Sequence, residues 1–422
     1  MVLSLAIFFL TITGVFLRPA RLSEVSIVAL GAGAMVLFGV VTLQETCQAL
    51  TGNINVLLFF LGLMVVAAIA ETAGIFNRVT TMAVTLARGS GRRLLLIIFG
   101  IGTIITLLLS NDATALMLTP VVLIMAIRLN LNPLPYAFAC AFIANAASIL
   151  LPMANPVNLL AVDAFDLRLG DYLKHLLLPS LVAISITIGL FLFIFRRELR
   201  TAFSTNIHYE SEFISSNGKL AVRVSIVLLF IACGYLFFSF KGWPLSVPVI
   251  AGAIILLIFG FSSNNLHWPD LRRSISWSIL PFIAGLSILV QGLESSGVID
   301  HLRIELVSFF SHGELSTSMA TSLGTATSAN LINNWPAMMI MVNTLAALPE
   351  TIAAHPDLPY QAILGAGLGP NITIFGSLST MLWLVTLRRR GLNVRLSSYF
   401  RLGLIITPPA IFGGSLVLFL LS

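Results

Sequence analysis

The chain has 422 residues, of which 58% are hydrophobic and 9% charged, with a formal net charge of +6 and a mean hydropathy of +1.00. Soluble domains carry about a quarter charged residues, so this composition excludes a soluble globular domain, a nucleic-acid-binding protein and a disordered chain. It indicates an all-α, polytopic membrane protein.

Ten apolar stretches have a length suited to a membrane span, since about 20 apolar residues cross the roughly 30 Å hydrocarbon layer. They lie near residues 1–17, 25–43, 54–75, 134–165, 176–195, 223–240, 245–261, 278–297, 360–387 and 402–421. In the first stretch the basic residues follow the apolar run, whereas a cleaved signal peptide has them in front. We therefore expect residues 1–17 to be a retained span.

Two further apolar stretches, 94–127 and 316–348, are too long for one span. The first has Ser110-Asn111-Asp112 at its centre, and the second has Asn333-Asn334. Each is either two full spans or a re-entrant hairpin, which enters and leaves the membrane on the same side. The polar centres favour two hairpins.

Basic residues set the predicted orientation, because cytoplasmic loops are rich in Lys and Arg. With two hairpins and a cytoplasmic Arg18 and Arg21 loop, 19 of the 23 Lys and Arg residues face the cytoplasm. The four exceptions are Arg168, Lys174, Lys241 and Arg303. The first hairpin then opens to the cytoplasm and the second to the outside of an inner (plasma) membrane, and both chain termini lie outside.

The two halves of the chain repeat one another. Gly62-Leu63 and Glu71 recur as Gly285-Leu286 and Glu294 at a constant offset of 223 residues. The matched elements run in opposite directions in the predicted topology, which is typical of inverted-repeat secondary transporters. The predicted units are N-terminal scaffold spans 1–53, a first repeat 54–195, a cytoplasmic linker 196–222, linking spans 223–277 and a second repeat 278–422.

Four polar breaks interrupt the apolar helices, two at the hairpin tips and two inside spans, which become broken helices. The breaks are 110–112, 145–158, 330–336 and 369–377, and they include Pro152, Pro156, Pro336 and Pro370. Proline removes a helical hydrogen bond, and a membrane interior tolerates freed backbone groups only inside protein or beside a wet cavity. Packing kinks are the alternative, but four breaks at repeat-related positions favour a binding site.

Asn and Ser side chains at the breaks are the candidate substrate ligands, because they both donate and accept hydrogen bonds. The set is Asn111, Asn145, Ser148, Asn155, Asn158, Asn333, Asn334, Asn371 and Ser377. No basic residue lies in any of the four breaks. This absence favours a neutral solute with hydroxyl groups, or a small cation.

Asp112 is the one acidic residue near the middle of an apolar stretch, where a charge costs about 2.5–3.5 kcal/mol. A carboxyl group away from water keeps its proton more readily, so we predict that Asp112 couples transport to protons, with Glu71 as the second candidate. The alternative for Asp112 is a local cap at the hairpin tip. For Glu71 it is a structural role at the end of a span.

The sequence contains no HExxH, GxSxG or Walker A motif, so we expect a transporter without a cofactor and not an enzyme. Cys47, Cys140 and Cys233 form no CxxC or Cys/His pattern. We therefore expect them to be neither disulfide partners nor ligands to a metal or to arsenic.

At its four breaks the sequence resembles the ArsB-type arsenite and antimonite efflux transporters of the ion transporter superfamily, which includes arsenical pumps and anion–sodium symporters. The similar stretches are Ser110-Asn111-Asp112-Ala113-Thr114-Ala115-Leu116, Leu150-Leu151-Pro152 with Asn155-Pro156-Val157-Asn158, Asn333-Asn334-Trp335-Pro336-Ala337, and Leu368-Gly369-Pro370-Asn371 with Gly376-Ser377-Leu378. The likeness runs from about residue 54 onward. It implies a solute held between two opposed hairpin tips and two broken helices. It also implies proton-coupled export of neutral arsenic or antimony hydroxides, with or without a separate ATPase subunit.

The sequence thus predicts a secondary transporter that exports arsenite or antimonite against inward proton flow. The alternative is a sodium/proton antiporter or a sodium-coupled carboxylate transporter of the same fold. A channel belongs to a different class, which needs no opposed hairpins and shows flux without coupling.

The three cysteines provide a first test. We predict that a triple variant with Cys47, Cys140 and Cys233 replaced by Ser still exports arsenite. The reason is that hydrogen bonds to the solute hydroxyls, and not slowly released arsenic–sulfur bonds, are expected to recognise it. Arsenite resistance of cells with equal amounts of membrane-inserted protein measures this. A normally inserted triple variant without export would show that a thiol takes part.

Overall fold

The computed structural model describes residues 1–17, 22–52, 54–203, 218–241, 243–262, 268–275, 277, 279–298, 301 and 313–422. Over these residues the regular structure is helical, apart from one isolated bridge between Ser90 and Ala202. The prediction of an all-α protein is confirmed. Arg18, Arg21 and Arg303, which enter the charge argument, lie outside the described residues, as do residues 204–217 of the predicted linker.

The first half of the chain forms helices up to the predicted linker. They are α1 (Val2–Leu17), α2 (Glu24–Leu37), α3 (Leu43–Gly52), α4 (Ile54–Thr72), α5 (Ile75–Ala87), α6 (Gly91–Leu108), α7 (Asn111–Ala113) continuing through a π-helical turn (Thr114–Leu118) into α8 (Thr119–Arg128), α9 (Leu134–Ala147), α10 (Pro156–Phe165) and α11 (Leu169–Ile194). A short 3₁₀ turn, Pro152–Ala154, lies between α9 and α10.

The second half follows the same plan after two additional long helices. Its helices are α12 (Gly218–Lys241), α13 (Ser246–Ser262), α14 (Trp268–Ser274), α15 (Ile279–Ser295), α17 (Glu314–Ile332), α18 (Asn334–Ala346), α19 (Pro349–Ala354), α20 (Leu358–Leu368), α21 (Leu378–Arg389) and α22 (Leu396–Leu421). Two 3₁₀ turns, Gly369–Asn371 and Ile374–Gly376, separate α20 from α21.

The helices of the two halves correspond in order and in local sequence. Both α9 and α20 begin with Leu-Pro-Tyr, at Leu134 and Leu358. The last helices of the two halves, α11 and α22, are both 26 residues long. The helices are interrupted at all four positions predicted from proline and polar residues, before α7, α10, α18 and α21.

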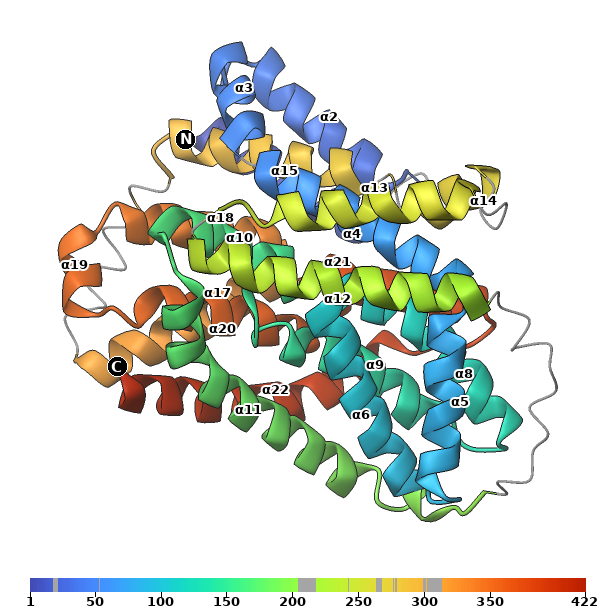
Figure 1. Cartoon of the computed structure of the whole chain (residues 1–422). Coiled ribbons are helices and arrows are strands. Elements are labelled where there is room, and N and C mark those ends of the chain that lie inside the picture. Colours follow the sequence, from blue (N-terminus) through green and yellow to red (C-terminus); the bar gives the residue numbers. More distant parts are fainter. Residues whose placement is uncertain are drawn as a thin grey trace.

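The helices form two groups that meet along α4, α10 and α18 (Figure 1). In one group α2 packs on α1 and α15, and α13 packs on α4 and α12. In the other, α11 packs along α22, α6 along α9, and α17 along α20. The four breaks belong to the second group, so its helices supply the polar part of any site.

An aromatic cluster fixes the two broken helices to each other. Phe142 of α9 packs against Phe191 at 5.1 Å and against Tyr399 at 5.4 Å between ring centroids. The indole N–H of the buried Trp383 in α21 donates to the carbonyl of Ala137 in α9 over 2.9 Å. Gly403 of α22 lies against the Asn371 backbone so closely that a Cβ atom there would overlap the Asn371 carbonyl group.

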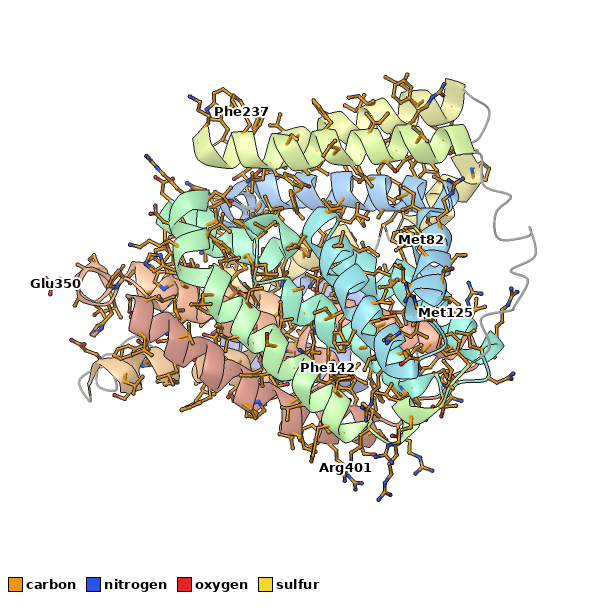
Figure 2. The ribbon with its side chains drawn as sticks, turned by 60° about the horizontal axis from the view of Figure 1, so that its bottom comes forward. Met82, Met125, Phe142, Phe237, Glu350 and Arg401 are labelled. Carbon is orange, nitrogen blue, oxygen red and sulfur yellow. The ribbon has the colours of Figure 1, made fainter. Side chains whose placement is uncertain are left out.

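Many large apolar side chains are exposed on the described surface, as expected of helices that face lipid. Figure 2 shows Phe142 in the middle of the molecule and Phe237 at its edge, where Phe237 is 54% exposed. Among the described residues five helices are long and apolar enough to cross a membrane, namely Ile54–Thr72, Gly91–Leu108, Asn111–Arg128, Leu169–Ile194 and Leu396–Leu421, and eight further apolar helices are shorter.

Four of the described helices lie outside the stretches predicted from hydropathy: α3, α5, α14 and α19. Of these, α3 begins with a reciprocal cap, in which the Thr42 N–H donates to the Glu45 carboxyl over 2.7 Å and the Glu45 N–H donates to the Thr42 hydroxyl over 3.2 Å. These bonds from Thr42, together with one from Ser295, hold the pKa of Glu45 below its usual range. The hydroxyl of Ser295 donates to Glu45 over 2.8 Å and ties α3 to the end of α15.

Candidate functional site

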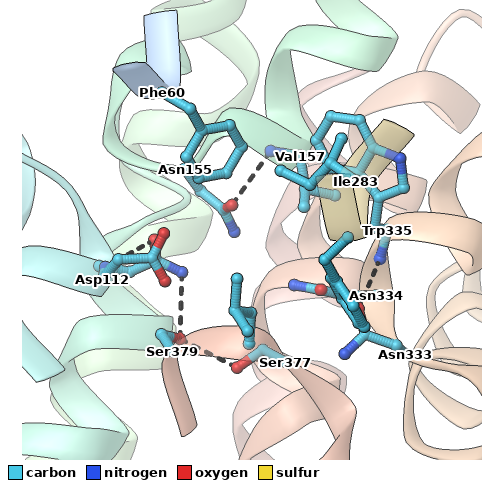
Figure 3. A pocket seen from close by; sticks show the side chains of 13 residues that line it. Phe60, Asp112, Asn155, Val157, Ile283, Asn333, Asn334, Trp335, Ser377 and Ser379 are labelled. Atoms are coloured by element: carbon cyan, nitrogen blue, oxygen red, sulfur yellow. Dashed lines mark hydrogen bonds between the residues drawn. The ribbon is translucent and has the colours of Figure 1, made fainter. Parts of the chain in front are cut away.

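A narrow cavity lies where the four breaks meet (Figure 3). The centre of a water molecule has about 20 Å³ to move in, which is room for one or two waters or a solute of a few heavy atoms. Six of the predicted site residues line this cavity: Asn111, Asp112, Asn155, Asn333, Asn334 and Ser377. The structure thus brings residues from all four breaks into one place.

Four helices begin at the cavity, α10, α18, α21 and the helix Asn111–Arg128. At each start a side chain caps the first turn: the hydroxyl of Ser110, the amide oxygens of Asn155 and Asn333, and the hydroxyl of Ser377 each accept a backbone N–H over 3.1–3.3 Å. The N-terminal end of a helix carries a partial positive charge. The cavity therefore favours oxygen atoms with lone pairs, or a negative charge.

The two predicted hairpin tips share an unusual backbone conformation. Ser110 has φ 152° and Asn333 has φ 77°, and both residues cap the helix that follows. The first tip leads directly into the π-helical turn Thr114–Leu118. Positive φ at residues other than glycine and π-helical turns both concentrate at functional sites. These features make the tips candidates for direct contact with a solute.

Asp112 presents an unpaired carboxyl group to the cavity. Figure 3 shows this carboxyl group and the Asn334 amide facing the cavity from opposite sides. Within the part of the chain that the structure describes, no hydrogen-bond donor or basic side chain reaches the carboxyl group. The helix is capped by Ser110, so the structure supplies no capping role for Asp112.

Asn145 and Asn371 lie behind the cavity and bind each other. The Asn145 amide donates to the Asn371 amide oxygen over 3.0 Å and to the Thr380 hydroxyl over 3.2 Å. The Asn371 amide donates to the carbonyl of Phe142 over 3.3 Å. Both side chains are 1% exposed. This pair joins the two broken helices and supports the cavity from outside its lining.

Ser148 and Asn158 also lie away from the cavity lining. The Asn158 amide donates to the Ser148 carbonyl over 2.8 Å and to the Tyr172 hydroxyl over 3.2 Å. The Ser148 hydroxyl donates to the carbonyl of Asn145 over 2.7 Å. These bonds shape the loop that presents Asn155 to the cavity.

The structure places Glu71 and the three cysteines away from the site. Glu71 follows Phe60 by 11 residues on α4, about 16 Å along the helix, and its electrostatic partner is Arg390. Cys140 is buried in α9, whereas Cys47 and Cys233 are exposed. Over the residues that the structure describes, no group of His, Cys, Asp and Glu could hold a metal ion.

Sequence reasoning missed the apolar wall of the cavity. Phe60 of α4 and both Phe282 and Ile283 of α15 come from the first helix group. In the second group, Trp335 follows the tip of the second predicted hairpin and Leu378 follows the break 369–377. Ser379 was also missed, although its hydroxyl accepts from the Asn111 amide over 3.4 Å and donates to Asn145 over 3.2 Å. An apolar residue inside an apolar stretch carries no local signal. Trp335 lies inside the break 330–336 and Ser379 lies two residues after the break 369–377, so their positions could have identified them.

Comparisons with known proteins show which transporters this chain is similar to. Residues 7–368 match the CitMHS family, which is described as citrate transporter. An arsenical pump membrane protein of Escherichia coli is 26% identical over 415 residues, covering 98% of this chain and 97% of that protein.

Two solved structures have a similar fold. The YdaH transporter of Alcanivorax borkumensis has a TM-score of 0.55 and 16% identity, and the match covers 89% of this chain and 86% of that one. MtrF of Neisseria gonorrhoeae, described with a class of antimetabolite efflux pumps, has a TM-score of 0.53 and 14% identity, and the match covers 90% of this chain and 83% of that one. The fold is that of an all-helical, multi-pass membrane transporter.

Two asparagine variants distinguish a residue that lines the cavity from a residue that holds the broken helices together behind it. Asn145→Ala leaves buried partners unpaired, so we predict that the purified protein loses about 1–3 kcal/mol of stability. Asn334→Ala removes an amide that faces the cavity and is predicted to weaken solute transport with little change in stability. Thermal unfolding in detergent and transport at equal expression measure the two effects. If Asn334→Ala lowers the thermal stability as much as Asn145→Ala, the assignment of Asn334 to the cavity and Asn145 to its structural support is wrong.

Proposed function

The chain belongs to the CitMHS family of membrane transporters, and we propose that it exports neutral trivalent arsenic and antimony hydroxides in exchange for protons. The observation that carries this proposal is the cavity itself. It joins four helix N-termini and several amides to one unpaired carboxyl group, without a basic side chain among its described lining residues.

The proposed architecture is an inverted repeat with about ten spans, two re-entrant hairpins (α6 with the helix 111–128, and α17 with α18) and two broken helices. Both arms of the first hairpin have 18 residues, so their length also permits full crossings. In the second hairpin α17 has 19 residues, but α18 has 13 and is too short for a full crossing. The meeting of both tips in one cavity supports re-entrance, because full crossings from opposite sides would leave the tips at opposite membrane surfaces.

The proposed orientation has both termini outside and the α5–α6 turn in the cytoplasm. Figure 1 supports the relative placement, since both termini and α19 lie at the left of the view and the α5, α6 and α8 ends lie at the right. The right end carries Arg88, Arg92, Arg93 and Arg128, as expected for a cytoplasmic face.

Charge and size support a small neutral solute over a carboxylate. A citrate-like anion would bring negative charge beside Asp112, and no described lining residue is Lys, Arg or His. A neutral trihydroxide can accept hydrogen bonds from helix N–H groups and donate hydroxyl hydrogens to Asp112 and to amide oxygens. The limited space in the cavity also suits a solute of few atoms.

Asp112 is the proposed site of exchange between solute and proton. In the loaded state its ionised carboxylate accepts hydroxyl hydrogens from the solute. After release outside, the carboxyl group takes a proton and the cavity returns without a net side-chain charge. An empty, ionised cavity is disfavoured by the cost of an uncompensated charge in the membrane, about 2.5–3.5 kcal/mol. One proton moving through 100 mV contributes about 2.3 kcal/mol, which can drive uphill export without the separate ATPase subunit that some relatives are expected to use.

Transport by everted membrane vesicles tests the function. We predict that an acid interior drives arsenite uptake and that a protonophore abolishes this uptake. A sodium gradient should not replace the proton gradient, and citrate should not replace arsenite as the transported solute. Vesicles from cells without the protein are the control. Sodium-driven uptake of citrate without arsenite uptake would establish the alternative, a sodium-coupled carboxylate transporter.

The coupling role of Asp112 has its own test. Asp112→Asn keeps the shape and hydrogen-bonding capacity of the side chain but cannot exchange a proton. We predict that it abolishes uphill export while some downhill solute exchange remains. Solute-induced proton movement in proteoliposomes is the measurement, with Glu71→Gln as the matched control because Glu71 lies away from the cavity. Undiminished proton movement in the Asp112 variant would assign the coupling to another group.

A further inference from the structure

A second, larger cavity lies one helical turn from the solute cavity. The volume open to the centre of a water molecule is about 360 Å³ in this cavity and about 20 Å³ in the solute cavity. It opens at the surface beside the exposed residues Gln48 and Glu294. Its wall includes α3, α4, α10, α15 and α18.

Four helices, α4, α10, α15 and α18, line both cavities at different positions along their length. On α4 the large cavity meets Val56 and the solute cavity meets Phe60; on α18 the corresponding residues are Met339 and Trp335. A spacing of four residues is about 6 Å along a helix. On α10 the large cavity is lined from Leu160 onward, three residues after Val157, and on α15 it is lined by Gln291, eight residues after Ile283. The large cavity therefore continues the solute cavity toward one end of the molecule.

Two aromatic rings of the solute cavity lie one helical turn from residues that line the large cavity. The rings of Phe60 and Trp335 are 6.1 Å apart between centroids and tilted by 50°. Phe60 is 6% exposed and Trp335 is 3% exposed. Phe60 belongs to the first helix group and Trp335 follows the tip of the second predicted hairpin, so the contact joins the two helix groups. Packed rings of this kind exclude water and polar solutes.

We propose that the large cavity is the outer vestibule of the transport path, and that Phe60 and Trp335 form the barrier between it and the solute site. This inference rests on the proposed function and on its orientation, in which the ends of α15 and α18 lie outside. It adds the route by which the solute leaves and the residues that close this route.

The vestibule has the charge expected for a path used by neutral solutes and protons. Its side chains include Asp163 and Glu294, which accept from the amides of Asn55 over 3.3 Å and Asn343 over 3.1 Å. None of its described lining residues is basic. Carboxylates in a cleft concentrate cations and protons and repel anions. This agrees with the absence of a basic side chain from the described lining of the solute cavity.

Thiol labelling tests the path without needing a transported solute. In a background lacking native cysteines, Asn343→Cys reports on the vestibule and Leu378→Cys on the solute cavity. The probe is the membrane-impermeant, cationic methanethiosulfonate ethyltrimethylammonium, applied to intact cells or everted vesicles. We expect the cysteine at 343 to react from outside and the cysteine at 378 to react from outside at least tenfold more slowly.

Removing one ring of the barrier should let the reagent reach the cysteine at position 378 from outside. Phe60→Ala is expected to raise the outside reaction rate at 378 about tenfold or more. Phe59→Ala is the matched control, because Phe59 is the neighbouring buried aromatic residue on α4 but packs against Tyr235 at 5.8 Å. Phe60→Leu, which better preserves volume, serves if the Ala variant fails to insert, and a smaller increase in the same direction is expected from it.

Three results would overturn the inference. They are an unchanged rate at 378 in every inserted Phe60 variant, an equal increase in the Phe59 control, and labelling of position 343 only from the cytoplasmic side. Because labelling requires no substrate, a protein that fails to transport arsenite yet shows the expected pattern would refute the proposed substrate and retain the path and its barrier.

Discussion

The fold depends on providing hydrogen-bond acceptors for the backbone N–H groups at helix N-termini inside an apolar molecule. The first turn of every helix has N–H groups without a helical partner, and lipid supplies none. Here four such ends are directed at one cavity, where Ser110, Asn155, Asn333 and Ser377 cap them. Once these ends must meet, the positions of α9, α20 and the long helices α11 and α22 behind them are strongly restricted.

Convergence of the four ends also sets the electrostatics of the cavity. Their partial positive charges are opposed by one carboxyl group, that of Asp112, with no base among the described lining residues. Such a site can hold a hydroxylated neutral solute or a proton on the carboxyl group. A second anion would find no cationic side chain there. In the proposed function the same chemistry connects solute choice to proton exchange.

The cavity has two walls of different origin. Its polar wall comes from the breaks of one helix group, and α4 and α15 of the other group contribute only apolar residues. The Phe60–Trp335 contact spans this boundary. A site divided in this way changes its access whenever the two groups move relative to each other, while its hydrogen-bonding groups stay together. This arrangement suits a transporter better than a continuously open pore.

The sequence by itself determined the helical class, the internal similarity and the four interruptions, because proline and polar residues in an apolar run act locally. Only the tertiary structure decided that Asn145 and Asn371, 226 residues apart, pair with each other while Asn334 faces the cavity. In sequence these asparagines are equivalent. Their roles differ because packing between distant helices fixes which amide finds a partner, and this packing also selects Phe60 and Ile283 from many similar apolar residues.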